Sequence, residues 1–163
     1  MRRLLAVLFT LGLLAAGSVA GQAKRESIQG VWRVVQVTIT GPSGRTIRRI
    51  QPNLIIFTTS HYSRVEDHAE GRRPILTDVT TASADELRAA WGPFFGEAGT
   101  YDLSAGSLLT MRPIVAKNPV AQASQLFSTY AFKLEGDTLV VTQQRDQNGP
   151  VANPVTVKAI RAE

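Results

Sequence analysis

The segment TTSHYSRVEDH, residues 58–68, contains both histidines of the chain, and Glu66 and Asp67 lie between them. Imidazole and carboxylate groups bind zinc in many proteins, so the segment is a candidate metal site. However, alternate residues of a strand face the same side, and His61 and His68 are seven positions apart. On one regular strand they would face opposite sides. We therefore expect no metal site but a hairpin, with His61 in its tight turn at a positive φ that histidine tolerates.

No other reactive group is marked by its spacing. The chain has no cysteine and no Gly-x-Ser-x-Gly motif, so thiol chemistry is excluded and a nucleophilic serine is not indicated. The glycines near residue 99 are not arranged as a phosphate-binding loop, and we expect no cofactor. No two carboxylates are paired by spacing for acid–base catalysis. The acidic side chains are expected on the surface: Glu66, Asp67, Glu70, Asp85, Glu97 and Asp102.

The N-terminal segment has the three parts of a secretory signal. A basic start at residues 1–3 precedes an apolar run at residues 4–17, and small residues follow up to Ala20. The apolar run is shorter than the ~20 residues that a membrane-spanning helix needs. We expect residues 1–20 to be cleaved, with cleavage after Ala23 as the alternative. The protein is then expected to be periplasmic or secreted, without a stable membrane anchor.

Cleavage after residue 20 leaves 163 − 20 = 143 residues, enough for one domain, which we expect at residues 28–163. Two of the 18 basic residues are removed and all 13 acidic residues remain, so the net charge is 16 − 13 = +3. This mild excess does not indicate an acidic partner, and the basic clusters RTIRR and GRRP are expected on solvated faces. We expect no nucleic-acid partner and a monomer or weak homodimer.

Beyond residue 27 the chain has the pattern of short strands separated by turn signals, as in antiparallel barrels and sandwiches. In the first strand, residues 31–40, Val35, Val37 and Ile39 share one face, and Trp32 is out of phase with them. This predicts a bulge, or a position for Trp32 at a closed end of the fold. The strands expected after it are 53–58, 62–67, 98–103, 107–115, 125–134, 138–144 and 154–161.

One short helix is expected between the third and fourth strands. Ser83 and Glu86 have the spacing of a capping box, and Pro93 ends the helix. Its apolar face consists of Leu87, Ala90 and Trp91. Because a helix of about two turns is not stable alone, we expect it to pack on the sheet or over an opening.

About eight sequential strands and one short helix predict an all-β fold, an antiparallel up-and-down barrel whose closure removes the sheet edges. Several fragments also resemble the bacterial lipocalin-like domain family, a family of calycin-type small β-barrels. These are GVW at 30–32, NLIIFTTSHYS at 53–63, FFGEAGTYDL at 94–103 and FKLEGDTLVVT at 132–142. The resemblance implies a lipocalin-like barrel in which Trp32, preceded by Gly30, fills the closed end and Arg161 lies against it.

The interior of the barrel is the expected binding site. An interior of eight strands is wide enough for one small ligand, and apolar walls with a few polar groups suit a small apolar or amphipathic molecule. Trp91 either covers the mouth or anchors the helix. A fully packed interior is the alternative. The residues expected to line the site are Phe57, Tyr62, Trp91, Leu108, Arg112, Leu126, Tyr130 and Phe132.

The function predicted from these patterns is ligand binding by a secreted lipocalin-like protein. Two alternatives remain on the same scaffold. An enzyme, such as an isomerase, cyclase or hydrolase, would act on an apolar substrate with Tyr62, Tyr130 or Arg112 as acid or orienting cation. A protein-interaction module would have a packed core and bind through its loops or sheet edge.

Overall fold

The computed structural model describes residues 28–105, 107–123 and 126–163. The predicted signal segment and both predicted cleavage sites lie outside the described residues.

Ten strands and two helices make up the described fold, in the order that follows. They are β1 (Gly30–Ile39), β2 (Arg45–Ile47), β3 (Asn53–Phe57), β4 (His61–Asp67), α2 (Ala84–Trp91), β5 (Phe94–Ser104), β6 (Leu108–Ala116), α3 (Pro119–Ala123), β7 (Ser128–Glu135), β8 (Thr138–Asp146), β9 (Gly149–Pro150) and β10 (Val155–Arg161). Since β2 and β9 have only three and two residues, eight strands form the wall.

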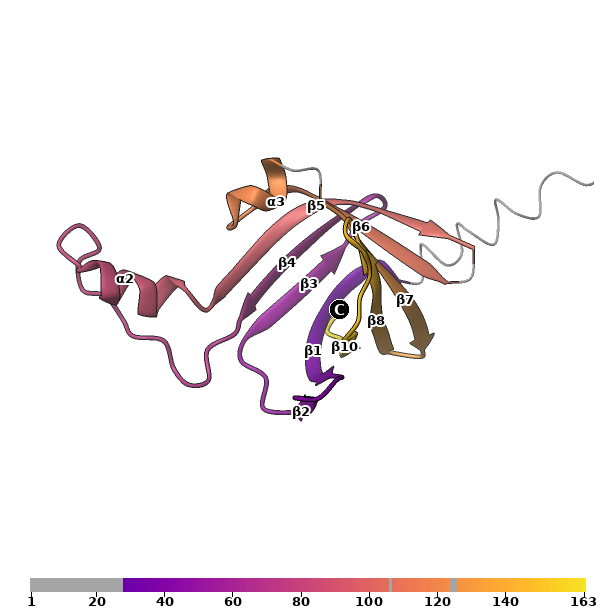
Figure 1. Cartoon of the computed structure of the whole chain (residues 1–163), viewed down its shortest axis with the longest axis horizontal. Helices are drawn as coiled ribbons and strands as arrows, with labels where there is room; N and C mark the ends of the chain where they lie inside the picture. Colours follow the sequence, from indigo (N-terminus) through magenta and orange to yellow (C-terminus); the bar gives the residue numbers. More distant parts are fainter. Residues whose placement is uncertain (1–27, 106, 124–125) are drawn as a thin grey trace, which may run out of the picture.

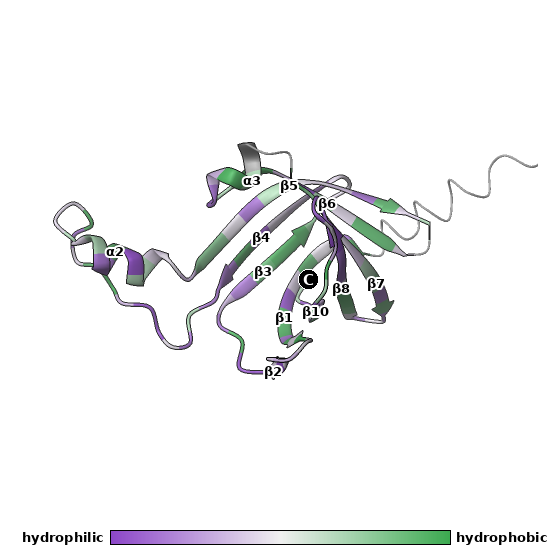
Figure 2. Ribbon diagram, viewed as in Figure 1, coloured by the Kyte–Doolittle hydropathy of each residue, from purple (hydrophilic) through white to green (hydrophobic). Residues whose placement is uncertain are grey.

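The wall is a closed antiparallel barrel with sequential strand order. Neighbouring strands follow the chain from β3 to β8, and β10 pairs with both β8 and β1, which closes the sheet. Figure 1 shows this ring of strands, and Figure 2 shows apolar and polar residues alternating along it. The predicted all-β, eight-stranded up-and-down barrel is therefore confirmed.

The predicted irregularity of the first strand is confirmed as a bulge in β1. Trp32 and Val34 are both buried, and the register with β10 shifts between Val34 and Gln36. β1 pairs with β3 only from Gly30 to Trp32, so the two strands separate just before the bulge. The side chain of Asn53 fills the gap: its Oδ1 accepts from the Val34 N–H at 2.6 Å and its Nδ2 donates to the Val34 carbonyl at 3.2 Å.

Trp32 closes one end of the barrel. Its side chain is fully buried, and its indole Nε1 donates to the Ile28 carbonyl at 2.8 Å. The guanidinium of Arg161 lies 4.2 Å from the centre of the Trp32 ring and donates to the Gln29 carbonyl at 2.7 Å. Gly30 has φ +126°, and a Cβ there would lie 2.6 Å from Arg161 Nη1, so a larger residue would displace the arginine.

The turn between β3 and β4 is a hairpin, as predicted, but His61 is not in the turn. It is the first residue of β4, and among the described non-glycine residues only Ser107 has a positive φ. Thr58 determines this register, because its N–H donates to the His61 carbonyl at 2.9 Å and its Oγ1 accepts from the His61 N–H at 3.2 Å. Thr59 and Ser60 are then the central residues of the turn.

Helix α2 has the predicted capping box between Ser83 and Glu86, but the prediction that it packs on the sheet or over an opening is wrong. Figure 1 shows α2 projecting beyond the ends of β4 and β5, and no described element packs extensively against it. Two cations hold its C-terminal end instead. Arg73 donates to the Ala90 carbonyl at 3.0 Å, and Lys117 donates to the carbonyls of Trp91, Gly92 and Phe94.

Candidate site inside the barrel

A row of polar side chains lies on the inner face of β4. Strand alternation directs Tyr62, Arg64 and Glu66 to the same side, and His68 follows two residues later. Tyr62 is buried, and the side chains of Arg64 and Glu66 are only 22% and 12% exposed. Val65, an apolar residue, is on the outer face and 41% exposed. The polarity of β4 is thus the reverse of that expected for a strand that packs against an apolar core.

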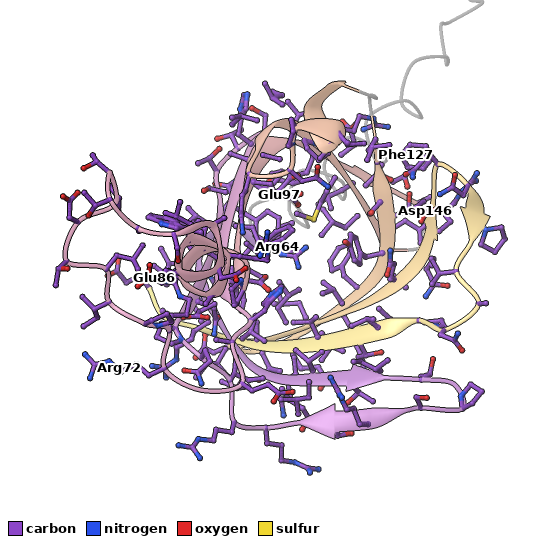
Figure 3. The ribbon with its side chains drawn as sticks, turned by 60° about the vertical axis from the view of Figure 1, so that its left-hand side comes forward. Arg64, Arg72, Glu86, Glu97, Phe127 and Asp146 are labelled. Carbon is purple, nitrogen blue, oxygen red and sulfur yellow. The ribbon has the colours of Figure 1, made fainter. Side chains whose placement is uncertain are left out.

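The inner face of β5 completes a cluster of charges. Glu97 accepts a hydrogen bond from the Tyr62 hydroxyl at 3.1 Å and lies 3.9 Å from Arg64 Nη1. Arg64 Nε donates to Glu66 Oε1 at 2.5 Å, and the other oxygen of Glu66 is 2.7 Å from His68 Nε2. Figure 3 shows Arg64 and Glu97 directed into the barrel.

Phe95 forms the apolar side of this cluster. The guanidinium of Arg64 lies 4.7 Å from the centre of the Phe95 ring, and the ring of His68 is stacked on it at 5.7 Å. A guanidinium is attracted to the face of an aromatic ring, and the attraction is stronger when both groups are partly shielded from water. Phe95 therefore helps to hold Arg64 in place.

The environment keeps Tyr62, Arg64 and Glu66 in their ordinary protonation states. Burial raises the pKa of Tyr62, and the neighbouring Glu97 carboxylate raises it further, so the phenol stays protonated. Burial alone would lower the pKa of Arg64, but Glu66, Tyr130 and Glu97 together outweigh burial and raise it. Burial alone would raise the pKa of Glu66, but Arg64 and His68 hold it below its usual value of 4.5. Tyr62, Arg64 and Glu66 therefore supply fixed charges and hydrogen bonds at neutral pH.

An inner cavity of about 190 Å³ lies beside this cluster. Arg64, Glu66, Tyr130 and Gln143 are its polar lining residues. The apolar wall includes Ile55, Phe57, Leu109, Met111, Leu139 and Val141.

Two further hollows adjoin the inner cavity. A mouth cavity of about 350 Å³ shares Arg64 and Glu66 with it and reaches Arg45 and Arg49 near β2. A side cavity of about 210 Å³ shares Met111 and Tyr130 with it. The side cavity exists because β6 pairs with β7 only over four residues, Leu108 to Met111. An open groove of about 820 Å³ follows the gap between β1 and β3, and it is lined by inward and outward side chains alike.

Several residues predicted for the ligand site do lie in the interior. Phe57 and Tyr130 line the inner cavity. Tyr62 and Leu126 line the side cavity, where Tyr130 also lies. Phe132 is buried in the core cluster that surrounds the cavities.

Three predicted residues are elsewhere. Trp91 lies on the projecting helix, 51% exposed and edge-on to Phe94. Arg112 is half exposed and pairs with Asp102 on the outer face. Leu108 alternates with the buried Leu109 on β6 and therefore faces outward. Nothing in the adjacent leucines of LLTM shows which of them faces inward.

Sequence reasoning also missed the charged part of the site. Glu66 and Glu97 were expected on the surface, but their side chains are only 12% and 13% exposed. One signal was present: Arg64, Glu66 and His68 follow Tyr62 at two-residue steps, so a strand that buries the tyrosine also directs them inward.

The two histidines do not converge. His61 is exposed at the start of β4 and bonds to Ser60, whereas His68 bonds to Glu66 beyond its other end. Within the described residues, no three side chains of histidine, aspartate or glutamate form a group that would hold a metal ion. No helix in the described part of the chain is long and apolar enough to cross a membrane.

No protein-family model and no curated protein matches this chain. Among solved structures it is similar to a redesigned β-barrel, with 12% identity and a TM-score of 0.42 over 85% of this chain and 95% of that chain. It is also similar to a de novo designed fluorescence-activating β-barrel, with 8% identity and a TM-score of 0.42 over 84% of this chain and 95% of that chain. The strand pairing of this chain makes it an eight-stranded antiparallel β-barrel, and these two designed barrels are similar to it.

Proposed function

We propose that this protein is a lipocalin-like carrier that binds one small apolar or amphipathic molecule inside the barrel. The observation that supports this is the inner cavity, whose wall combines a large apolar surface with a few polar groups. That combination is typical of binding sites for small molecules, because apolar walls provide affinity and a few polar groups orient the ligand.

The volume of the cavity indicates the size of the ligand. An apolar cavity of about 150 Å³ in another protein holds benzene, so about 190 Å³ is room for one substituted ring or a chain of similar size. A longer ligand would extend past Arg64 and Glu66 into the mouth cavity.

The lipocalin-like assignment is part of this proposal. It is supported by the GVW segment, in which Trp32 closes one end of the barrel and Arg161 covers its ring. The N-terminal signal pattern supports a periplasmic or secreted location. A carrier of this kind works as a monomer or weak homodimer.

Toluene titration by two-dimensional NMR tests the proposal directly. We expect saturable shifts of amides around the inner cavity, with a Kd on the order of 1 mM or tighter. Val141→Phe fills the cavity and is expected to abolish binding, whereas Val140→Phe changes the neighbouring residue on the other face of β8 and keeps it. Thermal denaturation establishes that both variants are folded. Absence of saturable shifts in the unaltered protein would overturn the proposal.

A further inference from the structure

We infer that the inner cavity selects a neutral, one-ring molecule with a hydrogen-bond acceptor such as a carbonyl oxygen, and that Arg64 donates to this acceptor. The inference deepens the proposed function and rests on it. It is carried by hydrogen-bond donors that line the cavity and have no acceptor among the described residues.

Arg64 supplies most of these donors. A guanidinium has five N–H groups, and the Arg64 Nε–H donates to Glu66. Nη1 is 3.9 Å from Glu97 Oε1, which is too long for a hydrogen bond. No described residue accepts from Nη1 or Nη2. No buried side-chain nitrogen or oxygen of the described residues lacks a partner, so these N–H groups reach accessible space. Arg64 lines both the inner cavity and the mouth cavity, which adjoin at this side chain, so a ligand in the inner cavity lies within reach of the guanidinium.

Two neutral groups stand beside the guanidinium. Tyr130 on β7 and Gln143 on β8 are directly opposite in the strand pairing, and both line the inner cavity. Within the described residues, neither the Tyr130 hydroxyl nor the Gln143 amide has a hydrogen-bond partner. Arg64, Tyr130 and Gln143 therefore form a polar corner, which we call the donor corner, in an otherwise apolar cavity.

The charges around the donor corner disfavour an ionised ligand. The single positive charge of Arg64 is opposed by two carboxylates, Glu66 and Glu97. A ligand carboxylate would add a third negative charge in a poorly hydrated space, where like charges repel strongly. The excess carboxylate charge would attract a ligand ammonium, but the ammonium would lie beside the Arg64 guanidinium and would find both oxygens of Glu66 already bonded. A neutral acceptor uses the free N–H groups without either cost.

Three probes of nearly equal size separate these chemistries: benzamide, benzoate and benzylammonium. In calorimetric or NMR titrations of the unaltered protein, we expect benzamide to bind about tenfold more tightly than toluene or either ion, as one or two good hydrogen bonds would produce. Equal or tighter binding of benzoate or benzylammonium would overturn the inference.

Variants then locate the preference. Arg64→Met combined with Glu66→Gln removes the guanidinium together with its bonded carboxylate, and it is expected to reduce benzamide affinity to that of toluene. Tyr130→Phe removes only a hydroxyl, so it maintains the fold if the double variant does not, and we expect a loss of about threefold to tenfold for benzamide and none for toluene. Arg112→Met, which removes an outer-face guanidinium, is the control and should change neither affinity.

The outcomes distinguish the inference from the proposed function. If toluene binds but benzamide shows no advantage, or if the advantage survives in both site variants, the donor corner is not used and this inference alone fails. If neither toluene nor benzamide binds the unaltered protein, the carrier function itself fails.

Discussion

Arg64 is a permanently charged group inside a barrel, and its position depends on Glu66. The two side chains are joined by a 2.5 Å hydrogen bond, and both are largely shielded from water. Removing one member of such a pair leaves the other charge poorly compensated, which costs more than the pair itself contributes.

Glu66→Gln is expected to lower the free energy of unfolding by about 1.5 to 3 kcal/mol at pH 7, as loss of a charged hydrogen bond usually does. The pKa of Glu66 is lower in the folded protein than its usual 4.5, so its contribution is present above pH 4.5 and is lost as pH falls through the folded value. The difference between the two proteins should therefore shrink below about pH 4.5. Urea unfolding of both proteins at several pH values from 7 to 3 measures this difference in unfolding free energy.

Glu70→Gln is the matched control, because Glu70 is an exposed glutamate on the loop after β4. It should leave stability nearly unchanged at either end of that pH range. If Glu66→Gln unfolds at the same urea concentration as the unaltered protein at pH 7, the ion pair does not stabilise the fold.

Among the neighbouring strands of the wall, β1 and β3 have the fewest paired residues. Their backbones pair for only three residues, and the Asn53 side chain then bonds both the N–H and the carbonyl of Val34. An amide side chain can replace a neighbouring strand in this way because, like a peptide group, it carries both a C=O acceptor and an N–H donor.

Asn53→Ala is expected to destabilise the protein by about 1 to 3 kcal/mol, since it removes both partners of the Val34 peptide groups. Amide hydrogen exchange should show faster exchange at Val34 than at Val37, whose strand pairing does not involve Asn53. Asn148→Ala, at an exposed turn, is the control for losing an asparagine. Equal stability of the two variants would contradict the bridging role.

The molecule as a whole consists of the closed barrel wall and one projecting segment, which connects β4 to β5 and contains α2. The segment from β4 to β5 that carries α2 leaves the barrel and returns to it, and its ends are adjacent because the His68 N–H donates to the Pro93 carbonyl at 2.9 Å. The barrel does not need α2 to cover either end, since Trp32 fills one end and α2 projects away from the wall.

Replacing residues 69–92 with a short glycine–asparagine turn is expected to leave the barrel folded. The strand signal in circular dichroism should persist, toluene binding should be retained, and the melting temperature should fall by only a few degrees. Val157→Pro is the contrasting variant: β10 pairs with strands on both sides, so proline should open the ring and unfold the protein. Loss of the fold on removing residues 69–92 would contradict the prediction that the barrel folds without the α2 segment.

The sequence by itself was sufficient for the features that depend on neighbours along the chain. Alternation and turn residues predicted eight sequential strands, the phase of Trp32 predicted the bulge, and Ser83 with Glu86 predicted the helix start. Each of these patterns is complete within about ten residues, so local physics determines it.

Only the tertiary structure decided which side chains face the cavity. Leu108 and Leu109 are chemically equal, and the pairing of β6 with its neighbours places Leu109 inside. The burial of Arg64 and Glu66 likewise depends on Glu97 and Phe95, which are supplied by a different strand. A buried charge needs partners that compensate for its lost hydration. Glu66 supplies one for Arg64 from the same strand, but Glu97 and Phe95 come from β5, so the alternation within residues 62–68 could not show that the charges would be compensated.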